Sequence, residues 1–347
     1  MDGIDVLPFP LKHQSETMPN PTSLIGQLFK PHDEQSFNEL SLELFRFQHK
    51  NNTVYGQFVD FLGKSPESIG HYREIPFMPI DFFKTHQVVT GHFDPEVVFT
   101  SSGTTGTTTS RHYIKSTDLY IQSFTQAFQY FFGSIKEYTI LALLPSYLER
   151  DGSSLVLMAD ELIKQSQQPD SGFFLHDYEK LADLLAHLKK LKKPTILLGV
   201  TYALLDMAEQ FPLNFPELVV METGGMKGKR KEMVREELHQ QLKMGFGVEQ
   251  IYSEYGMTEL LSQAYSKGNG LFNTPPWMKI LIRDTNDPLT LLSENQSGGI
   301  NVIDLANIYS CSFIQTQDVG KMHHNGSFEV LGRFDNSDIR GCNLLVG

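Results

Sequence analysis

The sequence is poor in cysteine and tryptophan and has no excess of basic residues. Of 347 residues two are cysteines, Cys311 and Cys342, so a disulfide framework is excluded and a reducing compartment is expected. The 29 lysines and arginines stand against 41 aspartates and glutamates, and this acidic balance argues against nucleic acid as the main partner. No apolar run is long enough to span a bilayer, and no signal-like pattern opens the chain. These absences predict a cytoplasmic protein with no membrane span.

What is present is an alternation of short apolar runs with segments of helical periodicity. This alternation is typical of βαβ units and a mostly parallel sheet. Apolar strands are expected at 139–145, 194–200 and 218–225. Helices are expected at 36–62, 119–132, 153–165, 178–191, 203–211 and 231–243. The predicted fold class is therefore α/β.

The pattern changes beyond Tyr265, where short strands with turn residues follow one another at 278–283, 299–304 and 327–331. This texture indicates a small β-rich subdomain. Many prolines among polar residues near the start indicate a loosely held segment. The expected organisation is a loose segment at 1–35, an α/β core at 36–275, a β-rich subdomain at 276–331, and a hinge and tail at 332–347.

One loop is rich in hydroxyls and glycine and follows a strand-like Val97-Val98-Phe99. Glycine permits backbone N–H groups to converge on one anion, and the hydroxyls add donors. Arg111 and His112, directly after the loop, supply positive charge. We therefore predict a phosphate cradle, made of Ser101, Ser102, Gly103, Thr104, Thr105 and Gly106.

Four more motifs follow the loop along the chain. Gly224 and Gly225 come at the end of a predicted strand, where ligands bind in open α/β sheets. The later motifs are Tyr255-Gly256-Met257-Thr258-Glu259, Thr316-Gln317-Asp318 and Gly332-Arg333-Phe334-Asp335. Each motif by itself is also compatible with a solvated loop or a turn, so the prediction depends on the order of the series.

In this order the motifs resemble the adenylate-forming superfamily, which includes acyl-CoA synthetases, firefly luciferase and peptide-synthetase adenylation domains. Within it, the chain is most similar to the acyl-protein synthetases of the LuxE type, from about residue 70 to the C-terminus. The segments that carry this resemblance are Ile75-Pro76-Phe77-Met78-Pro79, Phe82-Phe83-Lys84, 144–150, 221–228 and Arg340-Gly341-Cys342.

The resemblance implies activation of a carboxylic acid, expected to be a fatty acid, with ATP and Mg²⁺. It places the cradle on the β- and γ-phosphates, Gly224 and Gly225 along the adenine, and Tyr255 stacked on the base, with Gly256 in the same cofactor site. It assigns Thr258 to the α-phosphate, Glu259 to Mg²⁺, Asp318 to the ribose hydroxyls and Arg333 to the ribose or phosphate. The implied fold is the N-terminal domain of these enzymes, with most of the C-terminal lid domain absent.

The lid domain of typical members carries a lysine that contacts the reacting carboxylate. Its place is open here, and Arg111, His112, Lys115 and Lys227 are candidate substitutes. Cys342 matches the cysteine that receives the acyl group in acyl-protein synthetases, and a thiolate suits attack on an acyl-adenylate. We expect Cys342, Thr258, Arg111 and His112 to be catalytic, with an acyl-accepting reductase or transferase as partner.

Two other functions remain open at this stage. One is an acyl- or aryl-CoA ligase similar to phenylacetate-CoA ligases, and the other is a non-catalytic nucleotide-binding module. Cys311 is expected to be structural, and His323-His324 is expected to belong to a hairpin turn rather than a metal site. The phenylalanines at 77, 82, 83, 124, 128, 131 and 132 fit an acyl tunnel and a plain hydrophobic core equally well.

Overall fold

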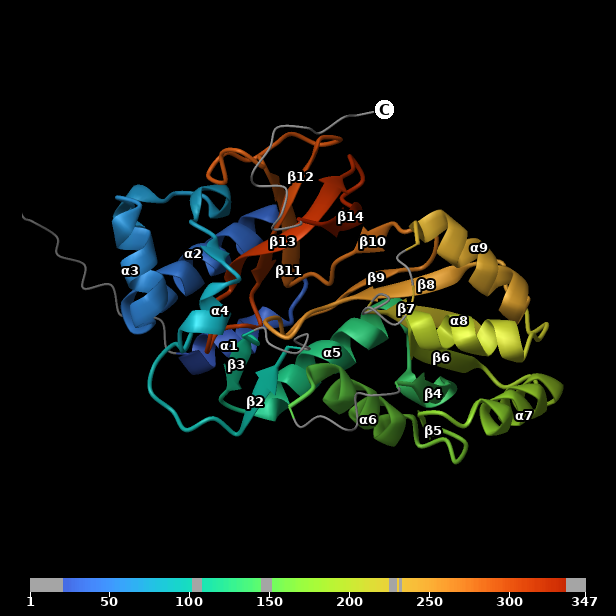
Figure 1. The fold of residues 1–347 in the computed structure, drawn as a ribbon. Helices are drawn as coiled ribbons and strands as arrows, with labels where there is room; N and C mark the ends of the chain where they lie inside the picture. Colours follow the sequence, from blue (N-terminus) through green and yellow to red (C-terminus); the bar gives the residue numbers. More distant parts are fainter. Residues whose placement is uncertain (1–20, 102–107, 145–151, 225–229, 231–232, 335–347) are drawn as a thin grey trace, which may run out of the picture.

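The computed structural model describes residues 21–101, 108–144, 152–224, 230 and 233–334. One large mixed sheet runs through this part of the chain, in the order β11-β12-β13-β14-β10-β9-β8-β7-β6-β4-β5, with β1 paired to β13. Figure 1 shows α2 and α3 (blue) at one end of the molecule and α7 and α9 (yellow-green to gold) at the other. The order places motifs from distant parts of the sequence on neighbouring strands.

Half of the sheet is parallel, as the alternating sequence pattern predicted. Its strands are β4 (Thr139–Leu143), β5 (Gly172–Phe174), β6 (Thr195–Val200), β7 (Val219–Thr223) and β8 (Ile251–Tyr255). Every residue of β4 and β6 is buried, which explains their continuous apolar runs. The helices of this half are α5 (Thr117–Phe132), α6 (Ser154–Ser166), α7 (Tyr178–Lys190), α8 (Thr201–Gln210) and α9 (Arg235–Phe246).

Capping residues start several of these helices where the sequence changes from loop to apolar periodicity. Ser116 accepts from the Asp118 amide, Ser153 from the Val156 amide and Asp177 from the Lys180 amide. The predicted helices at 119–132, 153–165, 178–191 and 203–211 agree with α5–α8 to within a few residues, and α9 begins later than predicted, at Arg235. The single helix predicted at 36–62 is wrong, because Asn52 ends α2 and caps the start of α3.

The other half of the sheet is antiparallel and continuous with the first. Its strands are β9 (Ala264–Ser266), β10 (Phe272–Asn273), β11 (Met278–Arg283), β12 (Ser297–Asp304), β13 (Phe313–Met322) and β14 (Phe328–Arg333). The expectation of mostly parallel layers is therefore correct for β4–β8 and wrong beyond β8. The change of direction occurs at β8, which pairs with β7 in parallel and with β9 in antiparallel fashion.

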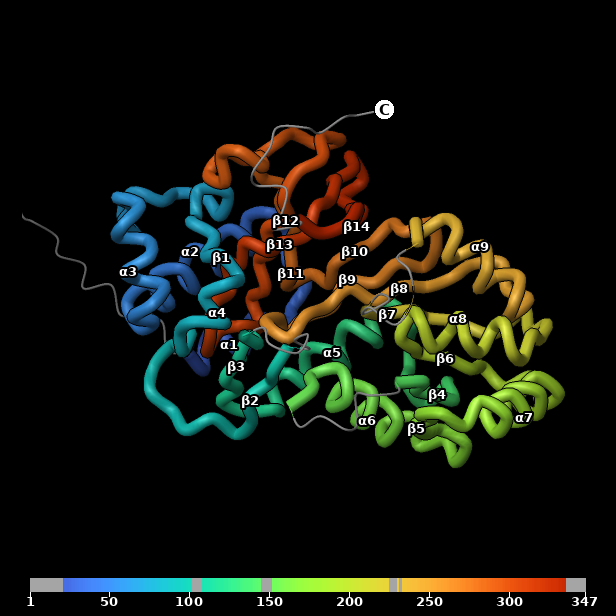
Figure 2. The backbone as a smooth tube through the Cα atoms, viewed as in Figure 1, coloured from blue at the N-terminus to red at the C-terminus, as the bar shows by residue number. Residues whose placement is uncertain are grey.

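The N-terminal helices lie over the antiparallel half. They are α1 (Pro21–Leu28), α2 (Glu34–Asn51), α3 (Thr53–Phe61) and α4 (Phe82–Thr85), with short 3₁₀ turns at Pro66–Ser68, Tyr72–Glu74 and, later, Ile135–Glu137. Leu24 and Leu28 of α1 are fully buried, although the sequence indicated a loosely held segment here. The tube of Figure 2 places β1 (Met78–Pro79) beside β13, with which it pairs in parallel.

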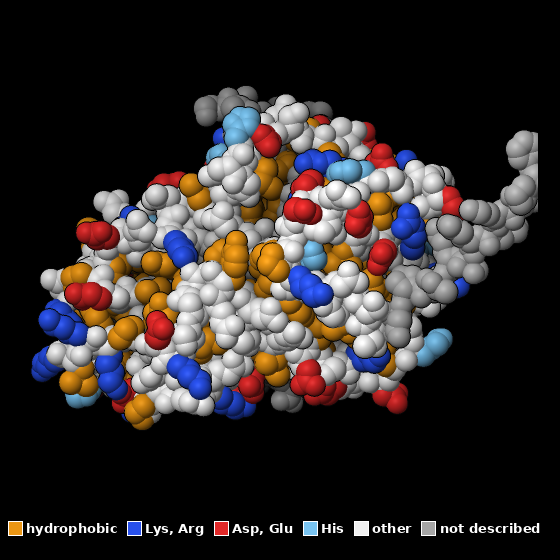
Figure 3. All heavy atoms as spheres, turned by 180° about the vertical axis from the view of Figure 1, so that it is seen from behind, with side chains coloured by type: hydrophobic (Ala, Val, Ile, Leu, Met, Phe, Trp, Pro, Cys, Tyr) orange, Lys and Arg blue, Asp and Glu red, His pale blue; other side chains and the backbone are white. Residues whose placement is uncertain are grey.

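A separate two-stranded hairpin, β2 (Val97–Thr100) and β3 (Arg111–Ile114), carries the predicted cradle loop. Within the part of the chain that the structure describes, no helix is long and apolar enough to cross a membrane. The rear face in Figure 3 shows apolar side chains in a central band and charges of both signs around it.

Candidate active site

The carboxyl ends of β7 and β8 form the edge at which the predicted motifs gather. β7 ends at Thr223, and Gly224 follows with a φ of 77°, a conformation that glycine adopts without strain. β8 ends at Tyr255, and the exposed Gly256 follows it. Gly225 and the candidate Lys227 lie outside the described residues.

Tyr255, Asp318 and Arg333 form one hydrogen-bonded cluster. The Tyr255 hydroxyl donates to Asp318 Oδ2 at 2.8 Å, and Arg333 Nε donates to Asp318 Oδ1 at 3.1 Å. Burial and the charge of Asp318 hold the pKa of Tyr255 well above its usual value. Although burial opposes it, Asp318 raises the pKa of Arg333. The fold thus joins residues from three of the predicted motifs.

The Tyr255 ring packs against two other aromatic rings. It meets Phe272 at 6.0 Å and Phe328 at 5.7 Å, both in edge-to-face geometry, and the side chain is 8% exposed. Stacking of this ring on a base stays a prediction.

A buried arginine supports the strand that carries Asp318. Arg283 Nη1 donates to Ile300 O at 2.7 Å, and its Nη2 donates to Thr316 O at 2.7 Å. Burial lowers the pKa of Arg283 to about 10, and the negative charge of Asp318 opposes this shift. Thr316 Oγ1 in turn accepts from the Asp318 amide at 3.1 Å. These hydrogen bonds hold the main chain at Thr316 and Asp318 in place.

Hydrogen bonds join the two ends of the cradle loop where it meets the β2–β3 hairpin. Thr100 pairs with Arg111 at the end of the β2–β3 hairpin. The pairing continues beyond the strands, because the Ser101 amide donates to Ser110 O at 3.2 Å and the Ser110 amide donates to Ser101 Oγ at 2.9 Å. Arg111 is exposed. The remaining predicted cradle residues, Ser102, Gly103, Thr104, Thr105 and Gly106, lie outside the described residues.

His112 connects this hairpin to the motif after β8. The imidazole is 1% exposed, and its Nδ1 lies 2.8 Å from Thr258 O. Its Nε2 lies 3.0 Å from Asn307 Oδ1, and Asn307 Nδ2 donates to Glu259 O at 2.7 Å. The His112 side chain therefore contacts the main chain of the predicted phosphate motif. It is not exposed to solvent as a free cation.

Glu259, the predicted metal ligand, is a buried carboxyl with positive charge nearby. Burial raises its pKa, while the Ser110 hydroxyl and the charges of Arg333 and Lys84 oppose the rise. Lys84 also pairs with Asp81 at 2.7 Å, and Asp81 accepts from Gln317 Nε2 at 2.7 Å. Lys84 was quoted from the sequence only as part of a family segment, yet it is the cation that α4 brings toward Glu259.

Two other carboxyl groups lie at the ends of the parallel strands. Thr223 Oγ1 donates to Glu254 Oε2 at 2.5 Å, and Thr201 Oγ1 donates to Glu222 Oε2 at 3.2 Å. Burial raises the pKa of Glu254 to about 7, and the charge of Glu222 adds to this effect. For Glu222, burial acts in the same upward direction, but the neighbouring His239 imidazole, 3.6 Å away, the Ser253 side chain and the charge of Arg235 outweigh it and lower the pKa.

The two cysteines and the paired histidines are separate from this cluster. Cys311 is buried, its thiol donates to Phe313 O at 3.4 Å, and burial raises its pKa to about 12, all consistent with a structural residue. Cys342 lies outside the described residues. His323 and His324 stand in the turn between β13 and β14, where the Gly326 amide donates to His323 O. The predicted hairpin turn is confirmed.

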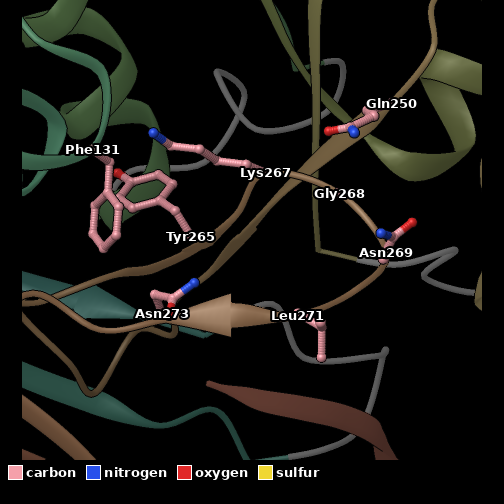
Figure 4. A pocket seen from close by; sticks show the side chains of 8 residues that line it. All are labelled: Phe131, Gln250, Tyr265, Lys267, Gly268, Asn269, Leu271 and Asn273. Atoms are coloured by element: carbon pink, nitrogen blue, oxygen red, sulfur yellow. The ribbon is translucent and has the colours of Figure 1, made fainter. Parts of the chain in front are cut away.

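An open pocket of about 280 Å³ lies at the β9–β10 turn, as Figure 4 shows. None of the predicted site residues is among the described residues that line it: Phe131, Gln250, Tyr265, Lys267, Gly268, Asn269, Leu271 and Asn273. Of the phenylalanines considered for an acyl tunnel, Phe131 borders this pocket. Phe77, Phe83, Phe124 and Phe128 are buried in the hydrophobic core.

Sequence reasoning missed several residues of the site. Asn307 and Arg283 belong to no motif, and Glu254, the neighbour of Tyr255 within its motif, was assigned no role. Each is a polar side chain placed by contacts distant in the sequence. His112 and Asn307, for example, are 195 positions apart. A buried polar residue within an otherwise apolar strand, as at Glu222 and Arg283, is the one signal in the sequence that points to them.

The fold is that of adenylate-forming enzymes. MatB from Rhodopseudomonas palustris with bound ATP matches with a TM-score of 0.54 and 16% identity, over 80% of this chain and 56% of that chain. A 2-hydroxyisobutyryl-CoA ligase in the postadenylation state with 2-HIB-AMP matches with a TM-score of 0.61 and 13% identity, over 88% and 70%. This chain thus spans little more than half of the MatB chain. No curated protein matches the sequence significantly.

The family model of the acyl-protein synthetase LuxE matches residues 27–347. The chain belongs to the LuxE acyl-protein synthetase family, a family of acyl-activating ligases. The family that the motif order predicted is confirmed.

Proposed function

We propose that the chain joins a carboxylic acid, in this family a fatty acid, to AMP and then transfers the acyl group through Cys342 to a partner protein. The observation that carries the proposal is the convergence of separate motifs on one edge of the sheet. Tyr255, Asp318 and Arg333 are hydrogen-bonded together, and His112 joins the cradle hairpin to Thr258 and Glu259.

The described residues fit an ATP site. Asp318 and Tyr255 offer hydrogen-bonding groups for a ribose and an aromatic ring for a base. The cradle residues Ser101, Ser102, Gly103, Thr104, Thr105 and Gly106 are assigned to the β- and γ-phosphates, and Gly224, Gly225 and Gly256 to the adenine. Thr258 is assigned to the α-phosphate, and Arg333 to the ribose or phosphate.

A magnesium ion fits the same site through Glu259. Among the described residues no group of three or more histidine, cysteine or acidic side chains could hold a metal by itself. Mg²⁺ that travels with ATP needs one or two carboxylates, because phosphate oxygens and waters complete its shell. Glu259, buried beside the Ser110 hydroxyl, supplies such a carboxylate. The ion would neutralise charge on the leaving pyrophosphate.

The first step is a displacement at phosphorus. A carboxylate oxygen of the acid attacks the α-phosphorus of ATP, the bond to the bridging β-phosphate oxygen breaks, and pyrophosphate leaves. Because both partners carry negative charge, the residues act by positioning and by charge neutralisation. Thr258 is assigned to donate to the α-phosphate. Lys84 and Arg333, whose charges act on Glu259, are candidate cations for this step, and the exposed Arg111 at the end of the cradle hairpin is a third candidate.

The second step forms a thioester. The Cys342 thiolate attacks the acyl carbon of the acyl-AMP, AMP leaves with its electron pair, and the thiol proton goes to solvent. A nucleophile of a partner reductase or transferase then attacks the thioester carbonyl carbon, the C–S bond breaks, and the Cys342 thiolate leaves. Thiolates are strong nucleophiles, and the acyl-phosphate mixed anhydride provides a good leaving group.

The test is acyl labelling of the whole chain. We expect incubation with ATP, Mg²⁺ and labelled fatty acids to leave a hydroxylamine-sensitive label on the wild type and on Cys311→Ala, and none on Cys342→Ala. Retention of the label by Cys342→Ala contradicts the acceptor assignment.

Two further outcomes separate the other functions. AMP release that requires coenzyme A and is unchanged in Cys342→Ala indicates a CoA ligase, the class of the matched 2-hydroxyisobutyryl-CoA ligase structure. Absence of acid-dependent pyrophosphate exchange for every acid tested indicates a non-catalytic nucleotide-binding protein.

A further inference from the structure

His112 lies between two oxygen acceptors. Its Nδ1 faces Thr258 O at 2.8 Å, and a carbonyl oxygen can only accept, so Nδ1 carries a proton. Its Nε2 faces the amide of Asn307 at 3.0 Å. The ring is therefore oriented by the motif that follows β8, although it belongs to the hairpin that carries the cradle.

The Asn307 amide is oriented by a second main-chain carbonyl. Its NH₂ group donates to Glu259 O at 2.7 Å, which turns the amide oxygen toward His112. A flipped amide would place two carbonyl-type oxygens, those of Asn307 and Glu259, against each other. Asn307 and His112 thus contact consecutive main-chain carbonyls, those of Thr258 and Glu259.

While the imidazole is neutral, no proton lies between His112 Nε2 and Asn307 Oδ1, because both atoms are then acceptors. Both ends of this chain of contacts are carbonyl acceptors, and a neutral ring has one donor and one acceptor. Burial lowers the pKa of His112 to about 4, so the neutral form prevails at physiological pH. A buried contact that is not fully satisfied costs stability, which calls for a reason other than folding.

Asn307 stands on a rigid support. Asp304, fully buried, accepts from the Leu261 and Ser262 amides at 2.7 and 2.9 Å, so it fixes the chain just after Glu259. Gln48 of α2 donates to Asn307 O at 3.0 Å from the other side. The connection between β12 and β13 therefore anchors residues 259–262 at several points.

We propose that His112 and Asn307 are positioning residues that lock the main chain of Thr258 and Glu259 and register the cradle hairpin against it. The two residues act through Thr258 and Glu259 and touch no reacting atom. The inference rests on the proposed function for the roles of Thr258 and Glu259. The hydrogen-bonded connection from His112 through Asn307 to these two residues is independent of that function.

The test compares Asn307→Ala and His112→Leu with a matched control. Ser310→Ala removes another buried hydrogen bond of the same connection, the one from Ser310 Oγ to Val88 O at 3.0 Å, which does not reach the motif. His112→Asn is a second comparison, because its amide nitrogen lies near the place of Nδ1 and keeps the donor to Thr258 O.

The first measurement is amide hydrogen exchange of residues 256–262 in the full chain without ligand. We expect exchange to be faster by about tenfold or more in Asn307→Ala and His112→Leu, unchanged in Ser310→Ala, and intermediate in His112→Asn. Unchanged protection in folded Asn307→Ala and His112→Leu, or an equal change in Ser310→Ala, overturns the proposal.

The second measurement is acid-dependent pyrophosphate exchange at varied Mg²⁺. We expect kcat to fall by about tenfold or more in Asn307→Ala and the Mg²⁺ requirement to rise, with wild-type values in Ser310→Ala. A wild type without pyrophosphate-exchange activity contradicts the proposed function. The amide hydrogen-exchange result then still decides whether His112 and Asn307 hold the main chain of Thr258 and Glu259. Active wild type with an equally active, normally Mg²⁺-dependent Asn307→Ala overturns the positioning role.

Discussion

Asp318 shares its two carboxylate oxygens between Arg333 and Tyr255, so a ribose must replace or join existing hydrogen bonds. We expect Asp318→Ala to raise KM for ATP in pyrophosphate exchange about 10- to 100-fold, since hydrogen bonds to a charged group contribute about 1.5–3 kcal/mol. Tyr255→Phe, which frees one oxygen and keeps the ring, should change KM less. An unchanged KM in Asp318→Ala contradicts the ribose assignment.

Glu254 gives a pH-dependent prediction at the same scale. Its folded-state pKa of about 7 stands above the ordinary value of 4.5 for a glutamate, so the folded chain retains a proton that the unfolded chain loses. Stability therefore falls as pH rises from about 4.5 to about 7. We expect Glu254→Gln to raise the free energy of unfolding at pH 8 by roughly 1–3 kcal/mol, and to have little effect at pH 4.

Urea denaturation at the two pH values measures this difference. Glu249→Gln, at an exposed position near the start of β8, serves as the control and should leave the stability unchanged at both. An equal effect of Glu254→Gln at pH 4 and pH 8 would show that burial does not hold the proton on Glu254.

At the scale of elements, α8 and α9 approach closely through a glycine. A Cβ at Gly245 of α9 would lie 3.0 Å from Ala208 Cα and 3.1 Å from Ala208 O in α8. We expect Gly245→Ala to force the helices apart and to lower the free energy of unfolding by about 1–3 kcal/mol. Thermal denaturation measures the change.

Gly26 of α1 is the matched control for this prediction. A Cβ there meets nothing within 4 Å, so Gly26→Ala should stabilise the protein by about 0.5–1 kcal/mol through helix propensity. If both substitutions change stability alike, the close helix contact is not what glycine provides at position 245.

The elements that sequence reasoning recovered are those with apolar periodicity. The strands β4, β6 and β7 and the helices α5–α8 bury apolar faces that their sequences display. β13 was not recognised as a whole, because its inward face beyond Ile314 is polar: Thr316 and Asp318 are buried there, alternating with half-buried neighbours. The same residues belong to the candidate site, and their polarity removes the apolar alternation from which a strand is predicted.

At the scale of the whole molecule, the site joins both halves of the mixed sheet, and a bound nucleotide should stabilise all of it. We expect MgATP at 100 times its Kd to raise the free energy of unfolding by about 2.7 kcal/mol, and Tm by several degrees. Differential scanning fluorimetry measures the shift, and Asp318→Ala should reduce it. A shift equal in the variant and the wild type would place the nucleotide elsewhere.

The sequence by itself determined the family, the order of the motifs and the elements whose apolar spacing is local. It also led to Tyr255, Asp318, Arg333, Thr258 and Glu259, because chemistry of this kind leaves short patterns of glycine, hydroxyl and charge. The tertiary structure alone decided that the sheet turns antiparallel after β8 and that Arg283 supports the strand of Asp318. It also joined His112 to the motif through Asn307. These features depend on contacts between residues up to 195 positions apart, and such contacts leave no periodicity in the sequence.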